Sequence, residues 1–242
     1  MSRRAVILAG GRGTRLRPYS VALPKPLMPV GDQSILEIII RQLAAAGFDH
    51  LTLAVNHQAD ILMAVFKDGA KWSVKIDYSL ETEPLGTMGP LRLAKELPEN
   101  FLVLNGDILT DLDFAAFYDA HVAESALMTI SASKRVQSID YGVLKLNDGG
   151  ELAAFEEKPQ IPYLVSMGVY CLNRRILPYI PEGRPYGFDN LVLKLIEMNE
   201  PARVAEHSGY WLDIGRPDDY QRATDDWPAL QKAMPVFGKR DV

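Results

Sequence analysis

The first half of the chain alternates between two patterns of hydrophobic residues. Four short apolar runs have the length of buried strands, at residues 5–8, 51–55, 74–78 and 101–104. Three further segments carry apolar residues at helical spacing, at residues 35–46, 57–66 and 89–97. The repeated strand–helix order predicts an α/β fold in which helices cover both faces of a mostly parallel sheet.

The second half is richer in strands. Apolar runs predict strands at residues 126–132, 142–146, 152–155, 164–172 and 202–206. Asp148, Gly149 and Gly150 form a hairpin signal between two of them. Residues 186–198 have a helical pattern, and residues 211–216 are expected to form a turn that leads into a last helix.

Two helices have clear starting signals. Ser34 can cap the helix that follows it, and Glu37 completes a capping-box pattern three residues later. The last helix is expected to begin at Pro217, with Asp218 and Asp219 in its first turn.

Composition restricts the protein's partners and surroundings. The 242 residues carry a net charge of −5, which argues against a general binder of nucleic acid or of acidic membranes. No segment approaches the ~18 consecutive apolar residues of a membrane helix. The single cysteine, Cys171, lies in an apolar run and is expected to be a buried structural thiol. The lack of any intramolecular disulfide fits a reducing cytoplasm.

The loop after the first strand has the features of an anion site. Gly10, Gly11 and Gly13 allow a sharp turn whose N–H groups can form an anion-binding hollow. Arg15 adds positive charge, and Lys25 stands between two prolines that stiffen its backbone. This combination suits a polyphosphate. It is neither the dinucleotide fingerprint, which needs a third glycine, nor a Walker loop.

The spacing G-G-x-G-T-R-L, followed about ten residues later by P-K-P, resembles the sugar nucleotidyltransferases. Members of this family join a sugar 1-phosphate to a nucleoside triphosphate and release pyrophosphate. The resemblance implies a Rossmann-like, mostly parallel or mixed sheet and a single catalytic domain over residues 1–242. Within it we expect a nucleotide-binding half at about 1–111, a sugar-phosphate-binding half at about 112–226, and a C-terminal tail at 227–242.

The same resemblance assigns roles to the loop and to two aspartates. Arg15 and Lys25 are the expected catalytic cations. Asp107, in Asn105-Gly106-Asp107, and Asp213, in Leu212-Asp213-Ile214-Gly215, match the family's metal-ligand motifs. Both are expected to hold Mg²⁺, which binds oxygen ligands and takes only one or two protein carboxylates. The backbone and side chains expected to bind the nucleotide are Leu8, Ala9, Gly10, Gly11, Gly13, Thr14, Glu81, Gly86 and Thr87.

Glu81 is the residue from which we predict the base of the bound nucleotide. Relatives that use UTP or dTTP have a glutamine five residues before the glycine that corresponds to Gly86. A carboxylate only accepts hydrogen bonds, so Glu81 suits the two adjacent donors of guanine better than the carbonyl oxygens of uracil or thymine. Glu81-x-Glu83-Pro84-Leu85-Gly86 also resembles the guanylyltransferase branch. The sequence therefore favours GTP, with thymidylyl, uridylyl, cytidylyl and adenylyl transfer as alternatives.

The resemblance assigns the sugar phosphate to Asn105, Gly142, Glu156, Lys158, Ser166 and Gly168. Glu156 would accept hydrogen bonds from sugar hydroxyls, and Lys158 would hold the sugar's phosphate. Ser166 stands where many relatives have asparagine, and this departure leaves the sugar open between mannose, heptose and glucose.

Readings from two other classes compete with the enzyme. One is a nucleotide-sugar-binding regulator without turnover, and the other is a dinucleotide-dependent oxidoreductase. The expected partners are a nucleoside triphosphate and a sugar 1-phosphate, in the cytoplasm, without nucleic acid or membrane. A homo-oligomer remains one of the options.

Overall fold

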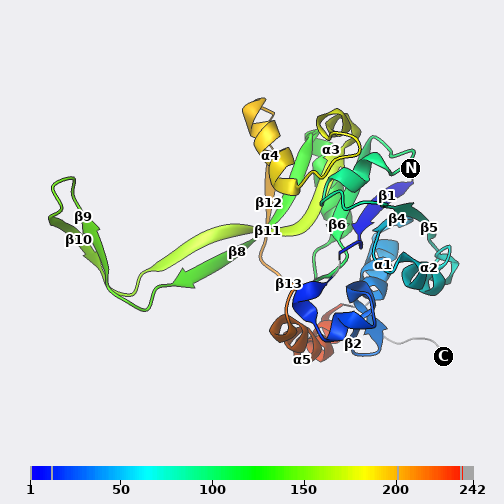
Figure 1. Cartoon of the computed structure of the whole chain (residues 1–242), viewed down its shortest axis with the longest axis horizontal. Helices are drawn as coiled ribbons and strands as arrows, with labels where there is room; N and C mark the ends of the chain where they lie inside the picture. The colour runs from blue at the N-terminus through cyan, green and yellow to red at the C-terminus, as the bar shows by residue number, and fades with distance from the viewer. Residues whose placement is uncertain (1, 12, 201, 235, 237–242) are drawn as a thin grey trace.

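A mixed sheet of seven strands organises the chain (Figure 1). The computed structural model describes residues 2–11, 13–200, 202–234 and 236. In spatial order the strands are β12 (Arg203–His207), β8 (Met128–Ser138), β11 (Gln160–Asn173), β6 (Asn100–Asn105), β1 (Arg3–Leu8), β4 (Phe48–Val55) and β5 (Lys75–Leu80). Only β11 runs antiparallel to its neighbours, and the other pairs are parallel, as the strand–helix alternation predicts.

Helices cover both faces of this sheet. They are α1 (Ile35–Ala45), α2 (Ala59–Phe66), α3 (Phe114–Glu124), α4 (Phe188–Glu197) and α5 (Pro217–Ala233). Successive residues of β1 point to opposite faces, so Ile7 packs in one hydrophobic core and Val6 in the other. The first core includes α1 and Trp227 of α5, and the second includes Leu191 of α4. The sheet is therefore buried on both sides, as expected for parallel strands.

The helix ends follow the predicted signals. Ser34 Oγ accepts a hydrogen bond from the Glu37 N–H at 3.2 Å, which starts α1 at Ile35. Pro217 is the first residue of α5, with Asp218 and Asp219 in its first turn. This helix continues past residue 226 and buries Trp227, within the segment that the sequence set apart as a tail.

One predicted helix is wrong. Residues 89–97 form only a short 3₁₀ helix, η5 (Gly89–Arg92), followed by irregular chain. The guanidinium of Arg4 donates to the backbone oxygens of Lys95 and Glu96, at 2.6 and 3.0 Å. In a continuing helix these carbonyl oxygens would accept hydrogen bonds from backbone N–H groups of the helix. Here they accept from Arg4 of β1 instead, so the predicted helix does not form.

Helix α3 was not predicted. Its hydrophobic pattern is weak, but Phe114 and Phe117 are buried and Asp113 caps its start by accepting from the Ala116 N–H at 2.9 Å. The segment at 211–216 also begins differently from the expected turn. Its first residues form the short strand β13 (Trp211–Asp213), which pairs with β7 (Ile108–Thr110).

The outer parts of β8 and β11 leave the body as a long two-stranded arm, which we define as residues 134–164 (Figure 1). Its tip carries a second small sheet, β9 (Val143–Leu146) and β10 (Leu152–Glu156). A third small sheet pairs β2 (Pro29–Val30) with β3 (Gln33–Ser34). Across the described residues, no helix combines the length and the apolar character needed to span a bilayer.

Candidate active site

The carboxyl ends of the central parallel strands converge where the strand order reverses. From β1 the chain adds β4 and β5 on one side, and β6 then pairs with the other side of β1. Leu8 at the end of β1 lies beside Ala54 of β4 and Asn105 of β6. In open α/β sheets such a reversal opens the crevice in which ligands bind.

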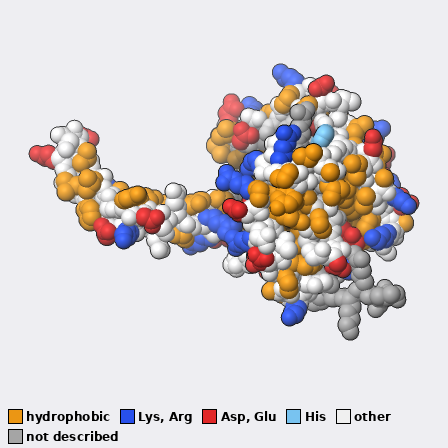
Figure 2. Space-filling view, turned by 60° about the horizontal axis from the view of Figure 1, so that its bottom comes forward, with side chains coloured by type: hydrophobic (Ala, Val, Ile, Leu, Met, Phe, Trp, Pro, Cys, Tyr) orange, Lys and Arg blue, Asp and Glu red, His pale blue; other side chains and the backbone are white. Residues whose placement is uncertain are grey.

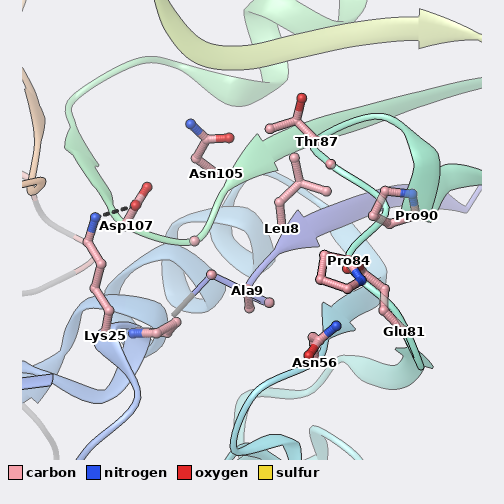
Figure 3. A pocket seen from close by; sticks show the side chains of 15 residues that line it. Leu8, Ala9, Lys25, Asn56, Glu81, Pro84, Thr87, Pro90, Asn105 and Asp107 are labelled. Atoms are coloured by element: carbon pink, nitrogen blue, oxygen red, sulfur yellow. Dashed lines mark hydrogen bonds and ion pairs between the residues drawn. The ribbon is translucent and has the colours of Figure 1, made fainter. Parts of the chain in front are cut away.

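A cavity of about 400 Å³ lies at this crevice (Figure 3). It is lined by Leu8, Ala9, Gly10, Gly11, Lys25, Pro26, Asn56, Glu81, Pro84, Gly86, Thr87, Pro90, Asn105, Gly106 and Asp107. Ten of the expected site residues are among them: nine from the end of β1 and the glycine loop, the 81–87 segment and the end of β6, and Lys25 from the segment between two prolines. Asn56, which follows β4, was missed. Its signal was its position as the first polar residue after an apolar strand beside β1.

The glycine loop is closed by contacts around Gly13. This residue has φ +58° and starts the 3₁₀ helix η1 (Thr14–Leu16). Its carbonyl accepts from Ser20 Oγ at 2.6 Å and from the Leu16 N–H at 2.9 Å. A Cβ here would lie 3.2 and 3.3 Å from the Cβ atoms of Ser20 and Lys25, which explains the glycine. Gly13 thus packs the loop against Lys25.

Lys25 forms the cationic end of the cavity. It begins the 3₁₀ helix η3 (Lys25–Leu27), follows Pro24, and is 8% exposed. Its ammonium donates to Asp107 Oδ2 (Figure 3). The other carboxylate oxygen, Asp107 Oδ1, is buried and has no hydrogen-bond partner. A buried acceptor without a donor is costly in a folded protein, so this oxygen is well suited to a bound cation.

Asp213 is held close to Asp107. The Ile214 N–H donates to the Asp107 backbone oxygen at 3.0 Å, which joins the chain after β13 to the turn after β6. Asp213 is exposed to solvent. Partial desolvation by the surrounding protein and the negative charge of Asp107 raise the pKa of Asp213. The positive charges of Lys25 and Arg15 lower it, but by less. A carboxylate whose pKa is raised by the negative charge of a second one lies close enough to it for the pair to share a cation.

The donor set fits magnesium. Mg²⁺ usually keeps several waters and uses one or two protein carboxylates, which Asp107 and Asp213 can supply. Within the described part of the chain, no group of three or more His, Cys, Asp or Glu side chains could hold a metal. Arg15 and Thr14 lie on η1 outside the cavity lining, and Arg15 acts on this corner through its charge on Asp213.

Glu81 forms the opposite end of the cavity, near Asn56 and Pro84 (Figure 3). Its side chain is 9% exposed, and Oε2 accepts from the Leu85 N–H at 3.1 Å. Burial raises the pKa of this carboxyl, and the hydrogen bond from Leu85 offsets part of that effect. A carboxylate has room for further donors after one hydrogen bond, so Glu81 is fixed in place and still able to accept.

The segment that carries Gly86 and Thr87 is fixed from the other side of the cleft. Gly86 has φ +75°, and a Cβ there would lie 2.8 Å from the Tyr186 carbonyl. Thr87 Oγ1 accepts from the Phe188 N–H at 2.8 Å, and the Met88 N–H donates to Tyr186 at 2.9 Å. The chain before α4 therefore holds this wall of the cavity in one conformation.

Two of the expected sugar-phosphate residues lie at the root of the arm. Gly168 has φ +74° and sits at a β-bulge in β11, where a Cβ would lie 2.5 Å from Asn105 Nδ2. Ser166 Oγ donates to the Tyr170 hydroxyl at 3.1 Å and accepts from the Gly168 N–H at 3.3 Å. The bulge thus places Gly168 against Asn105, at the edge of the cavity.

The structure separates the other three from the cavity. Gly142, Glu156 and Lys158 are exposed and belong to the arm, whose tip lies away from the body (Figure 1). Glu156 forms an ion pair with Lys145 across the small sheet. Lys158 has φ +45°, an unusual backbone conformation for a residue with a side chain. These residues reach no nucleotide-site residue of their own chain in this conformation.

The model of the nucleotidyl transferase family matches residues 4–229, nearly the whole chain. The chain belongs to this family. Mannose-1-phosphate guanyltransferase from Yarrowia lipolytica is 35% identical over 229 residues, which cover 91% of this chain and 63% of that protein. The UTP–glucose-1-phosphate uridylyltransferase of Synechocystis is 32% identical over 240 residues, covering 91% and 62%. The chain thus spans less than two thirds of the length of these curated relatives.

A solved structure of the same fold agrees. HddC from Yersinia pseudotuberculosis, in a complex with GMP-PN, superposes with a TM-score of 0.72 at 26% identity. The match covers 93% of this chain and 99% of that one. Membership of the nucleotidyl transferase family and the Rossmann-like sheet expected from the sequence are both confirmed.

Proposed function

We propose that the protein transfers a nucleotidyl group from a nucleoside triphosphate to a sugar 1-phosphate and releases pyrophosphate. The observation that carries this proposal is the cavity with two chemically different ends. Lys25 and Asp107 form an end for phosphates, and the buried Glu81 forms an end for a base. The family match supports the same reaction class.

In this reaction a phosphate oxygen of the sugar 1-phosphate forms a new bond to the α-phosphorus. The bond between the α-phosphorus and the oxygen that bridges to the β-phosphorus breaks, and its electron pair leaves with pyrophosphate. Both substrates are anions, so catalysis consists of holding them in line and neutralising the leaving charge. Lys25, fixed by its 3₁₀ helix, is suited to the departing phosphates, and Arg15 supplies further positive charge beside Asp213.

Asp107 and Asp213 would hold the magnesium ion. When bound, such an ion neutralises phosphate oxygens and helps to orient them. Before substrates arrive, the ammonium of Lys25 neutralises Asp107, which limits the cost of its partly buried charge. A lysine released from this carboxylate would be free to follow the phosphates.

GTP is the nucleotide that the base end favours. Glu81 can accept from N1–H and the 2-amino group of guanine together, whereas pyrimidine carbonyl oxygens would be repelled. The curated relatives include guanyltransferases, and the HddC structure contains GMP-PN. Mannose 1-phosphate or a heptose 1-phosphate is the proposed sugar substrate, and the cytoplasm the proposed compartment. Glucose 1-phosphate with UTP is the second candidate, favoured by the similarity to the Synechocystis enzyme.

The test is a pyrophosphate-release screen of GTP, UTP, dTTP, CTP and ATP against mannose, heptose and glucose 1-phosphates with Mg²⁺. We expect release with GTP and one of the first two sugars. Release with UTP and glucose 1-phosphate would select the second candidate. Tight nucleotide-sugar binding without release for any pair would instead indicate a regulator without turnover.

A further inference from the structure

We propose that the arm of one molecule enters the cleft of a second copy of this chain and completes its sugar-phosphate site with Glu156 and Lys158. This inference rests on the proposed function, because the role of these two residues depends on a sugar-phosphate substrate. It adds that each active site would be built from two chains.

The tip of the arm has an apolar face with nothing packed on it. Leu144 pairs with Phe155, and Leu146 pairs with Leu152, so the four side chains share one face of the small sheet. Their side chains are between 57% and 63% exposed. Figure 2 shows hydrophobic side chains along the arm out to its end. Such a face on a two-stranded sheet requires a cover, because an isolated hairpin is only marginally stable in water.

The root of the arm is fixed to the body, which argues against the arm folding onto its own cleft. Trp211 Nε1 donates to the Met167 carbonyl at 2.9 Å, on the bulge where the arm begins. The guanidinium of Arg135 lies 4.9 Å from the centre of the Trp211 ring and donates to its carbonyl at 3.4 Å. Because Arg135 belongs to the arm, its two contacts with Trp211 would have to change if the arm turned back at the bulge.

The ladder beyond the root is unbroken. The register from Ser133 opposite Val165 to Ser138 opposite Gln160 has no shift, and the Ile139 N–H continues it to the Pro159 carbonyl at 3.1 Å. At about 3.3 Å per residue, Gln160 lies roughly 20 Å along the strand from Ser166. Lys158 lies further still, so in this conformation it is available to another molecule and remote from its own cavity.

The charges of the outer part of the arm and of the glycine loop are complementary, whereas the whole arm, residues 134–164, is nearly balanced, with five acidic and four basic residues. Residues 140–158 contain five acidic and two basic residues. Residues 8–25, which contain the glycine loop and Lys25, have four basic residues and no acidic one. Arg15 and Arg17 of this loop are exposed. An acidic tip would therefore be attracted to the basic rim of a second copy's cleft.

The first test measures the assembly itself and needs no activity. Light scattering coupled to gel filtration should give a mass twice the 26.9 kDa of the chain. Leu144→Asp, on the exposed face of the tip, should give a folded monomer. Leu193→Asp, an equally exposed leucine of α4, is the matched control and should remain a dimer. A monomeric wild-type protein with full activity, or a Leu144→Asp dimer, would overturn the proposal.

The second test asks whether the arm acts on another chain. Lys25→Ala removes the lysine of the cleft, and Lys158→Ala removes the lysine of the arm. Each variant alone should be inactive, and its circular dichroism spectrum should match that of the wild type. After mixing and subunit exchange, half of the dimers join the two variants, and one of their two sites combines an intact cleft with an intact arm. The mixture should recover about a quarter of the wild-type rate if arms exchange within a two-fold dimer.

Lys25→Ala mixed with Asp213→Ala provides the control, because both defects lie in the cleft and no site in that mixture is intact. Recovery in the first mixture alone would support the exchange. No recovery in either mixture would mean that each arm serves its own cleft, and an active Lys158→Ala protein would remove the arm from the site. A wild-type protein without pyrophosphate release but with the predicted dimer would refute the proposed function and leave the assembly standing.

Discussion

The ammonium of Lys25 binds Oδ2 of Asp107 and leaves Oδ1 of the same carboxylate buried without a partner. The two residues come from distant parts of the chain, a proline-bounded 3₁₀ helix and the turn after β6. The unpaired oxygen, Oδ1, can bind a cation. The ammonium of Lys25, paired with Oδ2, balances the charge of Asp107 before that cation binds.

Lys25→Ala should lower turnover by about a hundredfold or more, as expected for a lost contact to charge that develops in the transition state. The rate of pyrophosphate release measures this, with circular dichroism to verify the fold. Lys232→Ala, an exposed position near the end of α5, serves as the control and should leave the rate unchanged. Near-normal turnover of a folded Lys25→Ala protein would remove the lysine from the mechanism.

Asp213→Asn should raise the Mg²⁺ concentration needed for half-maximal activity and lower turnover together. The same substitution should slightly stabilise the metal-free protein at neutral pH. Crowding by protein atoms raises the pKa of Asp213 above its ordinary value of 3.8, so the folded state carries this charge at a cost. The gain should shrink as the pH falls through the raised pKa and vanish below about 3.8, where both states are protonated.

Thermal unfolding in EDTA between pH 3 and pH 8 measures that difference. Asp218→Asn, an exposed residue in the first turn of α5, is the matched control and should leave the magnesium midpoint unchanged. If Asp213→Asn left both the magnesium midpoint and the rate at wild-type values, Asp213 would not be a metal ligand.

Glu81→Gln should relax the choice of base. A buried carboxylate that faces carbonyl oxygens lacks donors, which should give wild type a tenfold to hundredfold preference for GTP over UTP and dTTP, about 1–3 kcal/mol. Glutamine can also donate, so the variant should narrow this ratio of kcat/KM. Glu83→Gln, exposed and two residues away, should keep it. A GTP preference that Glu81→Gln does not alter would exclude Glu81 from base recognition.

The preference for GTP should also depend on pH. Only the ionised carboxylate can accept both guanine donors, and burial raises the pKa of Glu81. As the pH is lowered, kcat/KM for GTP should therefore begin to fall at a higher pH than an ordinary glutamate would give. The pH profile of Glu81→Gln should lack this step. Coincident profiles for the two proteins would contradict the assignment.

Gly168→Ala should weaken the sugar-phosphate side of the site. Its Cβ would lie 2.5 Å from Asn105 Nδ2, so the amide at the cavity edge must move. Gly150→Ala is the matched control, because Gly150 has a similar φ of +81° with open space around it. Both should lose about 1–2 kcal/mol of stability from the left-handed backbone. Only Gly168→Ala should raise KM for the sugar phosphate, and equal KM values would contradict the contact.

The residue pattern by itself predicted most of the strands and helices of the body, although not α3 or the irregular chain at 93–97. The family resemblance, rather than the pattern, supplied most of the expected cavity residues. Alternating strands and helices predicted the parallel part of the sheet, because burial on both faces leaves continuous apolar runs. Parallel strands bring their carboxyl ends to one edge, so the glycine loop and Asp107 could be expected to meet. Ser34 and Glu37 located the start of α1 because capping is a local interaction.

Tertiary contacts decided what local patterns could not. The Arg4 guanidinium, bonded to the carbonyls of Lys95 and Glu96, ended the helix that spacing alone predicted. Only the folded chain placed Asn56 in the cavity and joined Lys25 to Asp107, since both depend on long-range packing. Strand periodicity also says nothing of where a ladder leads once it leaves the sheet. The arm therefore carries Lys158 away from the cleft, although its motif resembles a sugar-phosphate site.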